Sequence, residues 1–427
     1  MLPPNHALRS ELNDEVHARP SDALPTPARI SYLVLFSEIS ARESEWLHVM
    51  ELVRRMGGVE PARASNHFSA DLGPVSIRWE RHSEFTRYTI IRPGAGENPF
   101  AETALQCVPE DWIAGIGGQL MVASHGALIR ADTAEIDYDD IASRWFNGNV
   151  MVGSRVGDDA AIALTDFRVR DDGFSRFLLL DRELTRRQAG RTIQRILEID
   201  TYRMMALLTL PVARELTPFL TKCEQELSQV TTSLEHVDDD QEATLLDGLT
   251  RLEALLESRL ADNHFRFGAA AAYYELVQRR IVELREVRIH GLQTFSEFTE
   301  RRLAPAMNTC RSVFGRQESL SQRVARANQL LSTRVDITRE RQNMALLESM
   351  NRRGKAQLKL QQTVEGLSAA AVTYYIVGLV GYLTKGLKSG GVSVNPEIAM
   401  AISIPVVMLF AVVGIHRIRD TIMRKAK

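Results

Sequence analysis

The sequence predicts an α+β N-terminal sheet domain, followed by a long helical bundle or stalk and a two-helix C-terminal transmembrane hairpin. Three observations lead to this prediction. Short apolar segments fill the first part of the chain, charged residues then alternate with Leu, Ile, Val and Met, and two uncharged runs lie near the C-terminus. The expected parts are a cytoplasmic domain at 1–180, a coiled-coil-like stalk at 181–363, transmembrane helices at 364–384 and 398–416, an external loop at 385–397 and a basic cytoplasmic tail at 417–427.

The N-terminal domain has the pattern of a sheet with few helices. Arg29–Phe36 is short, apolar and aromatic, which is typical of a strand. A helix is predicted at 40–56, where large apolar residues recur at helical spacing. Because the strands follow one another with few helices between them, an α+β sheet fits better than an alternating parallel fold. The remaining predicted strands are 67–71, 75–82, 85–92, 119–129, 149–156, 161–169 and 176–180, with a short helix at 111–116.

The helical region begins near Asp181, where glycine and proline become rare. Pro211 and Pro218 are expected to kink or end its first helix. A second helix is expected from about Ala243 to His290. The turn before this helix is predicted at the acidic run 238–240.

The last stalk helix has the spacing of a coiled coil. Its apolar residues follow one another at steps of three or four, and no proline interrupts it between Pro305 and Thr384. Such a helix would be roughly 120 Å long at 1.5 Å per residue. It must bury its stripe against the preceding helices, against copies of itself, or against both, so an intramolecular three-helix bundle and an oligomeric stalk both remain open. The stripe consists of Leu320, Val324, Ala327, Leu331 and Val335.

Two uncharged runs form the expected membrane anchor. Gly366–Thr384 and Ile398–Ile415 each reach the roughly 18 to 20 residues that cross a hydrocarbon core of about 30 Å. Pro405 lies within the second run, and proline is tolerated in membrane helices because neighbours re-satisfy the freed backbone groups. The alternative is a buried helical pair in a soluble protein.

The charges around these runs predict the orientation of the anchor. Basic residues flank the outer ends of both runs, whereas the loop between them contains only Lys385 and Lys388. By the positive-inside rule, both termini are expected in the cytoplasm. Residues 1–20 contain no apolar core of the kind found in signal peptides. The flanking residues are Arg352, Arg353, Lys355, Lys359, Arg417, Arg419, Arg424, Lys425 and Lys427.

Composition argues against several classes of function. The formal net charge of the 427-residue chain is −2, so we expect no nucleic-acid partner. Cys107, Cys223 and Cys310 are far apart and form no Cys-x-x-Cys pair, which argues against a disulfide framework and a cysteine metal site. Gly94–Gly96 and Gly115–Gly118 lack the other residues of a dinucleotide fingerprint or a P-loop, and we expect no cofactor.

A group of charged residues and histidines is the candidate ligand or partner face of the sheet. Arg78, Glu80, His82 and Glu84 alternate along one predicted strand and would share a face, with His67 on a neighbouring strand. Histidine and carboxylates together suit divalent-cation binding or acid–base chemistry. The alternative is a salt-bridged solvent face, since cross-strand charge pairs commonly stabilise sheets.

Two smaller candidates lie elsewhere in this domain. His17 and Arg19 belong to a polar N-terminal segment that would either dock into a cleft or cap the domain. Asp166 and Arg168 would share a strand face, where an ion pair is the simplest interpretation.

The anchor contains the remaining candidates. Glu365 lies at its expected cytoplasmic edge, where it would line a pore mouth or face lipid headgroups. Thr373, Tyr374, Gly378 and Gly381 would let helices approach closely, which suits assembly and ion conduction equally.

Several motifs resemble those of one protein family. They are LNDEVHARP at 12–20, RWERHSEF at 78–85, TDFR at 165–168, GRTIQR at 190–195, YRMMALL at 202–208 and QQTVEGLS at 361–368. Together, across nearly the whole chain, they resemble the bacterial membrane-anchored proteins of domain-of-unknown-function family 3422. The resemblance implies a bacterial inner-membrane protein and supplies neither a reaction nor functional residues.

The order of the parts is also similar to that of the CorA-type magnesium channels. Those channels have a sheet domain, a long stalk helix that continues into the first span, a second span and a basic tail. They carry a Gly-Met-Asn signature at the end of the first span, and Gly378–Thr384 contains no such motif. The similarity therefore concerns layout alone.

The sequence thus supports two main hypotheses. The first is a non-enzymatic scaffold of the inner membrane, which contacts lipid, forms homo-oligomers through its stalk helices and presents its sheet domain to a cytoplasmic protein. The second is a CorA-like oligomeric ion channel or transporter lined by copies of the first span. An enzyme within the N-terminal domain is a third possibility.

Overall fold

The computed structural model describes residues 5–9, 12–13, 23–61, 65–94, 96–131, 136–234, 239–391 and 393–425. These residues fall into two compact units. The first comprises Met1–His236 and Asp247–Asn328, and the second comprises Val237–Leu246 and Gln329–Lys427.

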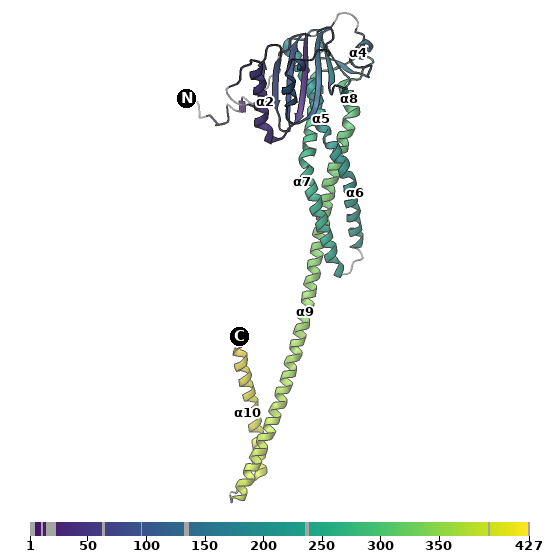
Figure 1. Cartoon of the computed structure of the whole chain (residues 1–427). Helices are drawn as coiled ribbons and strands as arrows, with labels where there is room; N and C mark the ends of the chain where they lie inside the picture. The colour runs from purple at the N-terminus through teal and green to yellow at the C-terminus, as the bar shows by residue number, and fades with distance from the viewer. Residues whose placement is uncertain are drawn as a thin grey trace. The chain divides into compact units, whose positions relative to one another are not determined.

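A mixed sheet is the framework of the first unit (Figure 1). In the described part of the chain it has nine strands in the order β2-β3-β4-β1-β5-β8-β7-β6-β9. Neighbouring strands are antiparallel, except that β5 and β8 run parallel. The strands are β1 (Ala28–Phe36), β2 (His67–Asp71), β3 (Ser76–Arg81), β4 (Phe85–Pro93), β5 (Gln119–Arg130), β6 (Val152–Val156), β7 (Ala161–Thr165), β8 (Ser175–Asp181) and β9 (Val287–Arg288).

Side chains alternate between the two faces along each strand, and each face of the sheet contacts different helices. In β3, Ile77 and Trp79 join an apolar core with α2, whereas Arg78 and Glu80 point to the opposite face, which α5 covers. The helices on the first face are α2 (Arg42–Arg55), α3 (Glu110–Ala114) and α4 (Tyr138–Trp145), together with the 3-10 turns η1 (Ile39–Ala41) and η2 (Ala104–Cys107).

Helix α5 (Arg186–Leu207) packs against β5 and β8. It begins at a capping box, in which the Thr185 hydroxyl accepts a hydrogen bond from the Gln188 backbone N–H and the Gln188 side chain accepts one from the Thr185 backbone N–H. Residues such as Ile193 and Leu197 lie on its buried face.

Long helices complete the first unit. Arg316 of α9 pairs with Glu224 of α6 at 2.6 Å, and the Phe314 ring lies 5.3 Å from the Phe267 ring of α7. These contacts hold α6, α7 and the first part of α9 together. The elements are α6 (Thr209–Ser233), α7 (Asp239–Leu284), α8 (Phe295–Arg302) and α9 (Ala304–Ser389).

The second unit contains the rest of α9, the first turns of α7, and α10 (Pro396–Lys425). Two described helical segments, one ending at Ser389 and one at Pro396–Ile415, are long and apolar enough to cross a membrane. Only 17% of the most apolar stretch in the first segment is buried, and none of that in the second, so neither stretch forms a protein core.

The predicted strands are confirmed, with ends shifted by up to four residues. Pro218 does not end a helix as one of the two expected effects required, because it lies inside α6, and the helix break falls at Leu208. The predicted helix to His290 is too long, since α7 ends at Leu284 and the chain then forms β9 beside β6. Asp238 of the predicted turn lies outside the described residues.

The first testable prediction compares two glycine-to-alanine changes. A Cβ at Gly153 in β6 would overlap the Leu164 side chain and lie 3.2 Å from the Ala163 carbonyl oxygen, whereas one at Gly248 in α7 would meet open space. We expect Gly153→Ala to lower the free energy of unfolding by about 1–3 kcal/mol. Gly248→Ala, the matched control, should raise it by up to about 1 kcal/mol, because alanine is the better helix former.

Denaturant unfolding of the purified chain in detergent measures both values. Equal effects of the two changes would contradict this close packing of β6 against β7.

Candidate functional site

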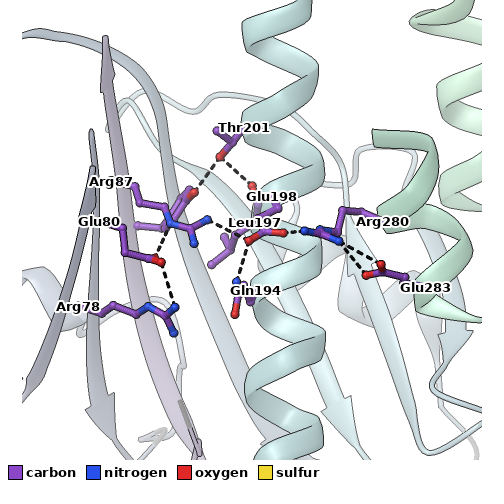
Figure 2. A network of polar contacts seen from close by, with 10 residues as sticks. Arg78, Glu80, Arg87, Gln194, Leu197, Glu198, Thr201, Arg280 and Glu283 are labelled. Carbon is purple, nitrogen blue, oxygen red and sulfur yellow. Dashed lines mark hydrogen bonds and ion pairs between the residues drawn. The ribbon is translucent and has the colours of Figure 1, made fainter. Parts of the chain in front are cut away.

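A chain of buried ion pairs crosses from the sheet to the helices (Figure 2). Glu80 on β3 accepts a hydrogen bond from Arg87 on β4 at 2.5 Å. Arg87 also donates to Glu198 on α5 at 3.0 Å, and Arg280 on α7 donates to the other oxygen of Glu198 at 2.5 Å. Arg78 donates to the second oxygen of Glu80 at 3.0 Å. We call these five residues the Glu80–Glu198 network.

Local structure explains how these side chains meet. The antiparallel register of β3 and β4 places Glu80 directly opposite Arg87, and directly opposed side chains share a face. Arg78, two residues earlier on β3, lies on that face as well. Gln194, one turn before Glu198 on α5, donates to the Glu198 carboxylate at 2.7 Å.

Burial makes these pairings obligatory. Glu80 is 1% exposed, and Arg87 and Glu198 are each 3% exposed. A buried charge is strongly disfavoured unless it is paired and hydrogen-bonded. Each of these three groups meets this condition with at least two charged or amide partners.

The pKa shifts follow from burial and pairing. Burial alone would raise the pKa of Glu80, but the guanidinium groups of Arg87 and Arg78 outweigh it and lower that pKa to about 2. Burial likewise opposes ionisation of Glu198, yet Arg87 and Arg280 lower its pKa below the usual value. Burial would lower the pKa of Arg87, but its anionic neighbours raise that pKa well above the ordinary value.

A small cavity lies beside the network. Its volume is about 30 Å³, and its polar lining includes Tyr32, Arg78, Glu80, Thr89 and Gln194. This space accommodates about two water molecules. Because ligand pockets typically enclose about 300–1,000 Å³, the cavity is too small for a nucleotide or a metabolite.

The ion pairs of the network hold strands and helices together rather than supply a reactive group. A general base works best with a pKa near the ambient pH, and Glu80 and Glu198 are both held ionised far below neutrality. Within the described ranges, no group of three His, Cys, Asp or Glu residues is arranged to hold a metal ion. The network joins two strands to α5 and α7, so it fixes how these helices lie on the sheet.

The structure places Arg78, Glu80 and His67 of the predicted sheet face on one side of the sheet, since His67 lies directly opposite Glu80, and Arg78 pairs with Glu80. Glu84 belongs to a second cluster, where Arg266 of α7 donates to both its oxygens at 2.6 and 3.2 Å and the Tyr273 hydroxyl donates at 2.8 Å. The expected common strand is wrong here, because β3 ends at Arg81 and the turn redirects the residues that follow.

The predicted histidines make separate contacts. The His82 ring stacks on Phe85 at 4.4 Å. His67 lies directly opposite Glu80 in the β2–β3 register, and its Nδ1 is 3.1 Å from the Ser65 hydroxyl. The alternative of a salt-bridged solvent face is confirmed in its ion pairs, since Glu80 pairs with Arg87 across the strands, but wrong in its exposure, because α5 covers Arg78 and Glu80. His17 and Arg19 lie outside the described residues.

Asp166 pairs with a different arginine from the one expected. Its carboxylate accepts from Arg170 at 3.0 Å and from the Asn149 amide at 2.9 Å, while Arg168 contributes its backbone N–H at 3.2 Å. The shared strand face was wrong because β7 ends at Thr165.

Three members of the network were missed from the sequence. Arg87 was detectable, since a tight turn between two strands predicts that it faces Glu80. Glu198 also carried a signal, because it interrupts the apolar stripe of α5 beside Leu197 and Ile199. No sequence signal identified Arg280, since its partner is distant in sequence and α7 has other, exposed arginines.

The second unit exposes a long stretch of α9. Every residue from 339 to 364 is exposed, although the stretch includes Met344, Leu347 and Leu358. Glu365, at its end, is half-buried and accepts a hydrogen bond from Gln361 at 3.1 Å. This stretch has no cover from the described part of the chain.

The two apolar helices meet where the sequence places small residues. A Cβ at Gly381 would lie 2.5 Å from the Met400 sulfur, so α10 approaches α9 closely there. Tyr374 and Gly378 line a groove of about 680 Å³ between these helices. Thr373 lines the same groove, and its hydroxyl donates to the Ala369 carbonyl at 2.8 Å.

Comparison with protein families gives one match. Residues 4–422 match the family described as "Protein of unknown function (DUF3422)". This match confirms the resemblance that the sequence motifs suggested. No curated protein matches the chain.

The second prediction tests the Glu80–Glu198 network. Glu80→Gln removes the charge that neutralises two buried guanidinium groups, so we expect a loss of about 3 kcal/mol or more in the free energy of unfolding. Glu348→Gln is the matched control, because Glu348 pairs with Arg352 in solvent. The control should change stability by less than about 0.5 kcal/mol. Similar losses in the two variants would contradict the pairing described for Glu80.

The third prediction concerns acid pH. Because folding lowers the pKa of Glu80 from 4.5 to about 2, its contribution is complete above pH 4.5 and is lost as the pH falls toward 2. The stability advantage of the wild type over Glu80→Gln should therefore shrink across this window. Unfolding curves at several pH values measure the difference. A constant difference from pH 6 to 2 would show that Glu80 has an ordinary pKa in the folded protein.

Proposed function

This chain belongs to the DUF3422 family of proteins of unknown function, and we propose that it is a membrane-anchored, non-enzymatic scaffold. In this proposal it assembles through its stalk helix and presents the sheet domain to a protein partner in the cytoplasm. The observation that carries the proposal is α9, one uninterrupted helix of 86 residues that contributes to both units and ends in an apolar run.

Exposed apolar side chains support the membrane anchor. Leu379 in α9 is 62% exposed, and Phe410 in α10 is 73% exposed. Exposing such surface to water costs about 25 cal/mol per Å², whereas lipid accommodates it. The alternative of a helical pair buried in a soluble protein has no support in the burial of these stretches. We therefore assign both helices to a bilayer, and because the family resemblance implies a bacterial protein, we propose that this bilayer is the inner membrane.

The distribution of basic residues supports the orientation. Arg352, Arg353, Lys355 and Lys359 precede the first apolar run and are all exposed. The region between the two apolar helices has only Lys385 and Lys388. In our proposal, both ends of the chain and the sheet domain therefore lie in the cytoplasm.

The sheet domain supports a binding role over a catalytic one. Its buried carboxylates Glu80 and Glu198 are paired with arginines, and the cavity beside the network has room for only about two waters. A rigid domain of this kind suits the display of a surface to a partner. The Glu80–Glu198 network would keep that surface in a fixed relation to α5 and α7.

A CorA-like channel is the second candidate. It is favoured by the half-buried Glu365 at the start of the apolar run and by the groove that Thr373 and Tyr374 line. In that case the first spans of several copies would surround a pore. The Gly-Met-Asn signature of such channels does not occur in this run.

The fourth prediction separates these functions. After reconstitution into vesicles, we expect no flux of Mg²⁺, K⁺ or Cl⁻ above that of empty vesicles, and we expect a homo-oligomer by mass measurement in detergent. Robust flux would favour the channel and overturn the scaffold.

The same prediction covers topology. The background for labelling has Cys107, Cys223 and Cys310 replaced by alanine. An impermeant thiol reagent applied to intact cells should label Ser393→Cys between the helices, whereas Ser349→Cys should react only after permeabilisation. If an alkaline wash without detergent releases the chain from membranes, the proposed membrane anchor is wrong.

A further inference from the structure

Helix α9 carries a second apolar stripe, and this one is exposed. Leu330, Ile337, Met344, Asn351 and Leu358 follow one another at steps of seven residues. Leu330 is 73% exposed, Met344 is 59% exposed and Leu358 is 60% exposed. We call these five residues the heptad stripe.

The heptad stripe is distinct from the stripe that packs within the chain. Leu331 and Val335 are buried, at 2% and 6% exposure, and belong to the spacing recognised in the sequence. Leu330 immediately precedes Leu331 and is therefore turned about 100° around the helix from it. The first stripe is buried among the described helices, whereas Leu330, Met344 and Leu358 of the heptad stripe are each more than half exposed.

The period of the heptad stripe indicates what covers it. A straight α-helix has 3.6 residues per turn, so a seven-residue repeat drifts by about 20° in each heptad. Over four heptads a flat surface or a groove would lose contact with this stripe. A second helix that supercoils with α9 follows the drift and keeps every stripe residue at the interface.

We propose that the heptad stripe is the seam of a parallel, in-register pair formed with α9 of a second copy of this chain. The inference rests on the proposed membrane anchor. The apolar run that enters the bilayer continues the same helix, so a given stripe residue lies at the same height above the membrane in every copy. Each stripe residue then meets its own counterpart.

The positions three after each stripe residue are less apolar than the stripe itself, being Thr333, Glu340, Leu347, Gly354 and Gln361. In a parallel pair, the residue three positions after each stripe residue also faces the partner, and the next one flanks it. Leu347 occupies a facing position and is 64% exposed. Glu340 occupies another and would lie beside Glu340 of the second copy, with Arg341 at the flanking position to neutralise the like charges.

Lys355 shares the flanking position of Arg341, whereas three other basic residues point away from the seam. Arg352, Arg353 and Lys359 follow a stripe residue by one or two positions, which point away from a parallel partner. They therefore remain in solvent or near lipid headgroups instead of meeting like charges. Asn351 lies within the stripe, and a buried Asn pair at such a position favours two strands in one register.

The fifth prediction locates the seam by disulfide crosslinking. The full chain in native membranes, with its three cysteines replaced by alanine, receives one new cysteine. Met344→Cys and Leu358→Cys should form crosslinked dimers on mild oxidation. The matched controls Ser349→Cys and Ala356→Cys, five positions after a stripe residue, should crosslink at least fivefold less, because they point away from the partner.

Two further measurements test register and energetics. Copies that carry Met344→Cys, mixed with tagged copies that carry Leu358→Cys, should give no mixed dimer. Adding Met344→Lys to the Leu358→Cys chain should reduce the crosslinked fraction several-fold, whereas adding Ala356→Lys should leave it unchanged.

The outcomes separate the seam from the scaffold. Preferential crosslinking at Ser349→Cys and Ala356→Cys, with the chain still oligomeric and membrane-bound, overturns the seam and leaves the scaffold intact. Mixed dimers between positions 344 and 358 overturn the in-register arrangement. A monomer that stays in the membrane overturns both the seam and assembly through the stalk.

Discussion

The carboxylate of Glu198 is the point on which the first unit depends. It is buried on α5 and accepts hydrogen bonds from Arg87 on the sheet and Arg280 on α7. A charge in this position is tolerated only when both partners are present, so the rotation of α5 and the placement of α7 are constrained together. Glu80 extends the constraint to a second strand, because it pairs with the same Arg87.

Ion pairs of this kind contribute to specificity more clearly than to stability. The cost of removing several charges from water offsets much of their attraction, so an apolar core of the same volume would fold as well. Hydrophobic contacts are non-directional and do not require one particular partner, so an apolar core specifies the packing of the helices less strictly. We infer that in this protein the pairing favours one arrangement of α5 and α7 on the sheet. This is our physical account of a polar layer in an otherwise apolar interior, and it suits a domain whose proposed role is to present a fixed surface.

Helix α9 differs from the buried network in that much of its apolar surface is exposed. Its first part is covered by α6 and α7, but residues 339 to 364 and the apolar run that follows are open. An isolated helix gains little stability from its own backbone, and apolar side chains in water oppose it. In our proposals, lipid covers the apolar run, and α9 of a second copy covers the heptad stripe. Both proposals follow from the same requirement that exposed apolar surface be removed from water.

The sequence by itself determined the architecture and the strands. Short apolar and aromatic composition located segments such as Arg29–Phe36, because this signal is local along the chain. Uncharged runs such as Ile398–Ile415 likewise predicted helices long and apolar enough to span a membrane, since this property depends on length and composition alone. Arg78 and Glu80 were placed together because they alternate on one strand.

Only the tertiary structure decided the rest of the site. Glu84 turned to Arg266 of α7 instead of sharing the face of Glu80, because the strand ended three residues earlier. The arginine partners of Glu198 lie more than 80 residues away in either direction, and no local pattern encodes such a meeting. Pairing between distant charges depends on how helices pack on the sheet, and that packing is set by the whole core at once.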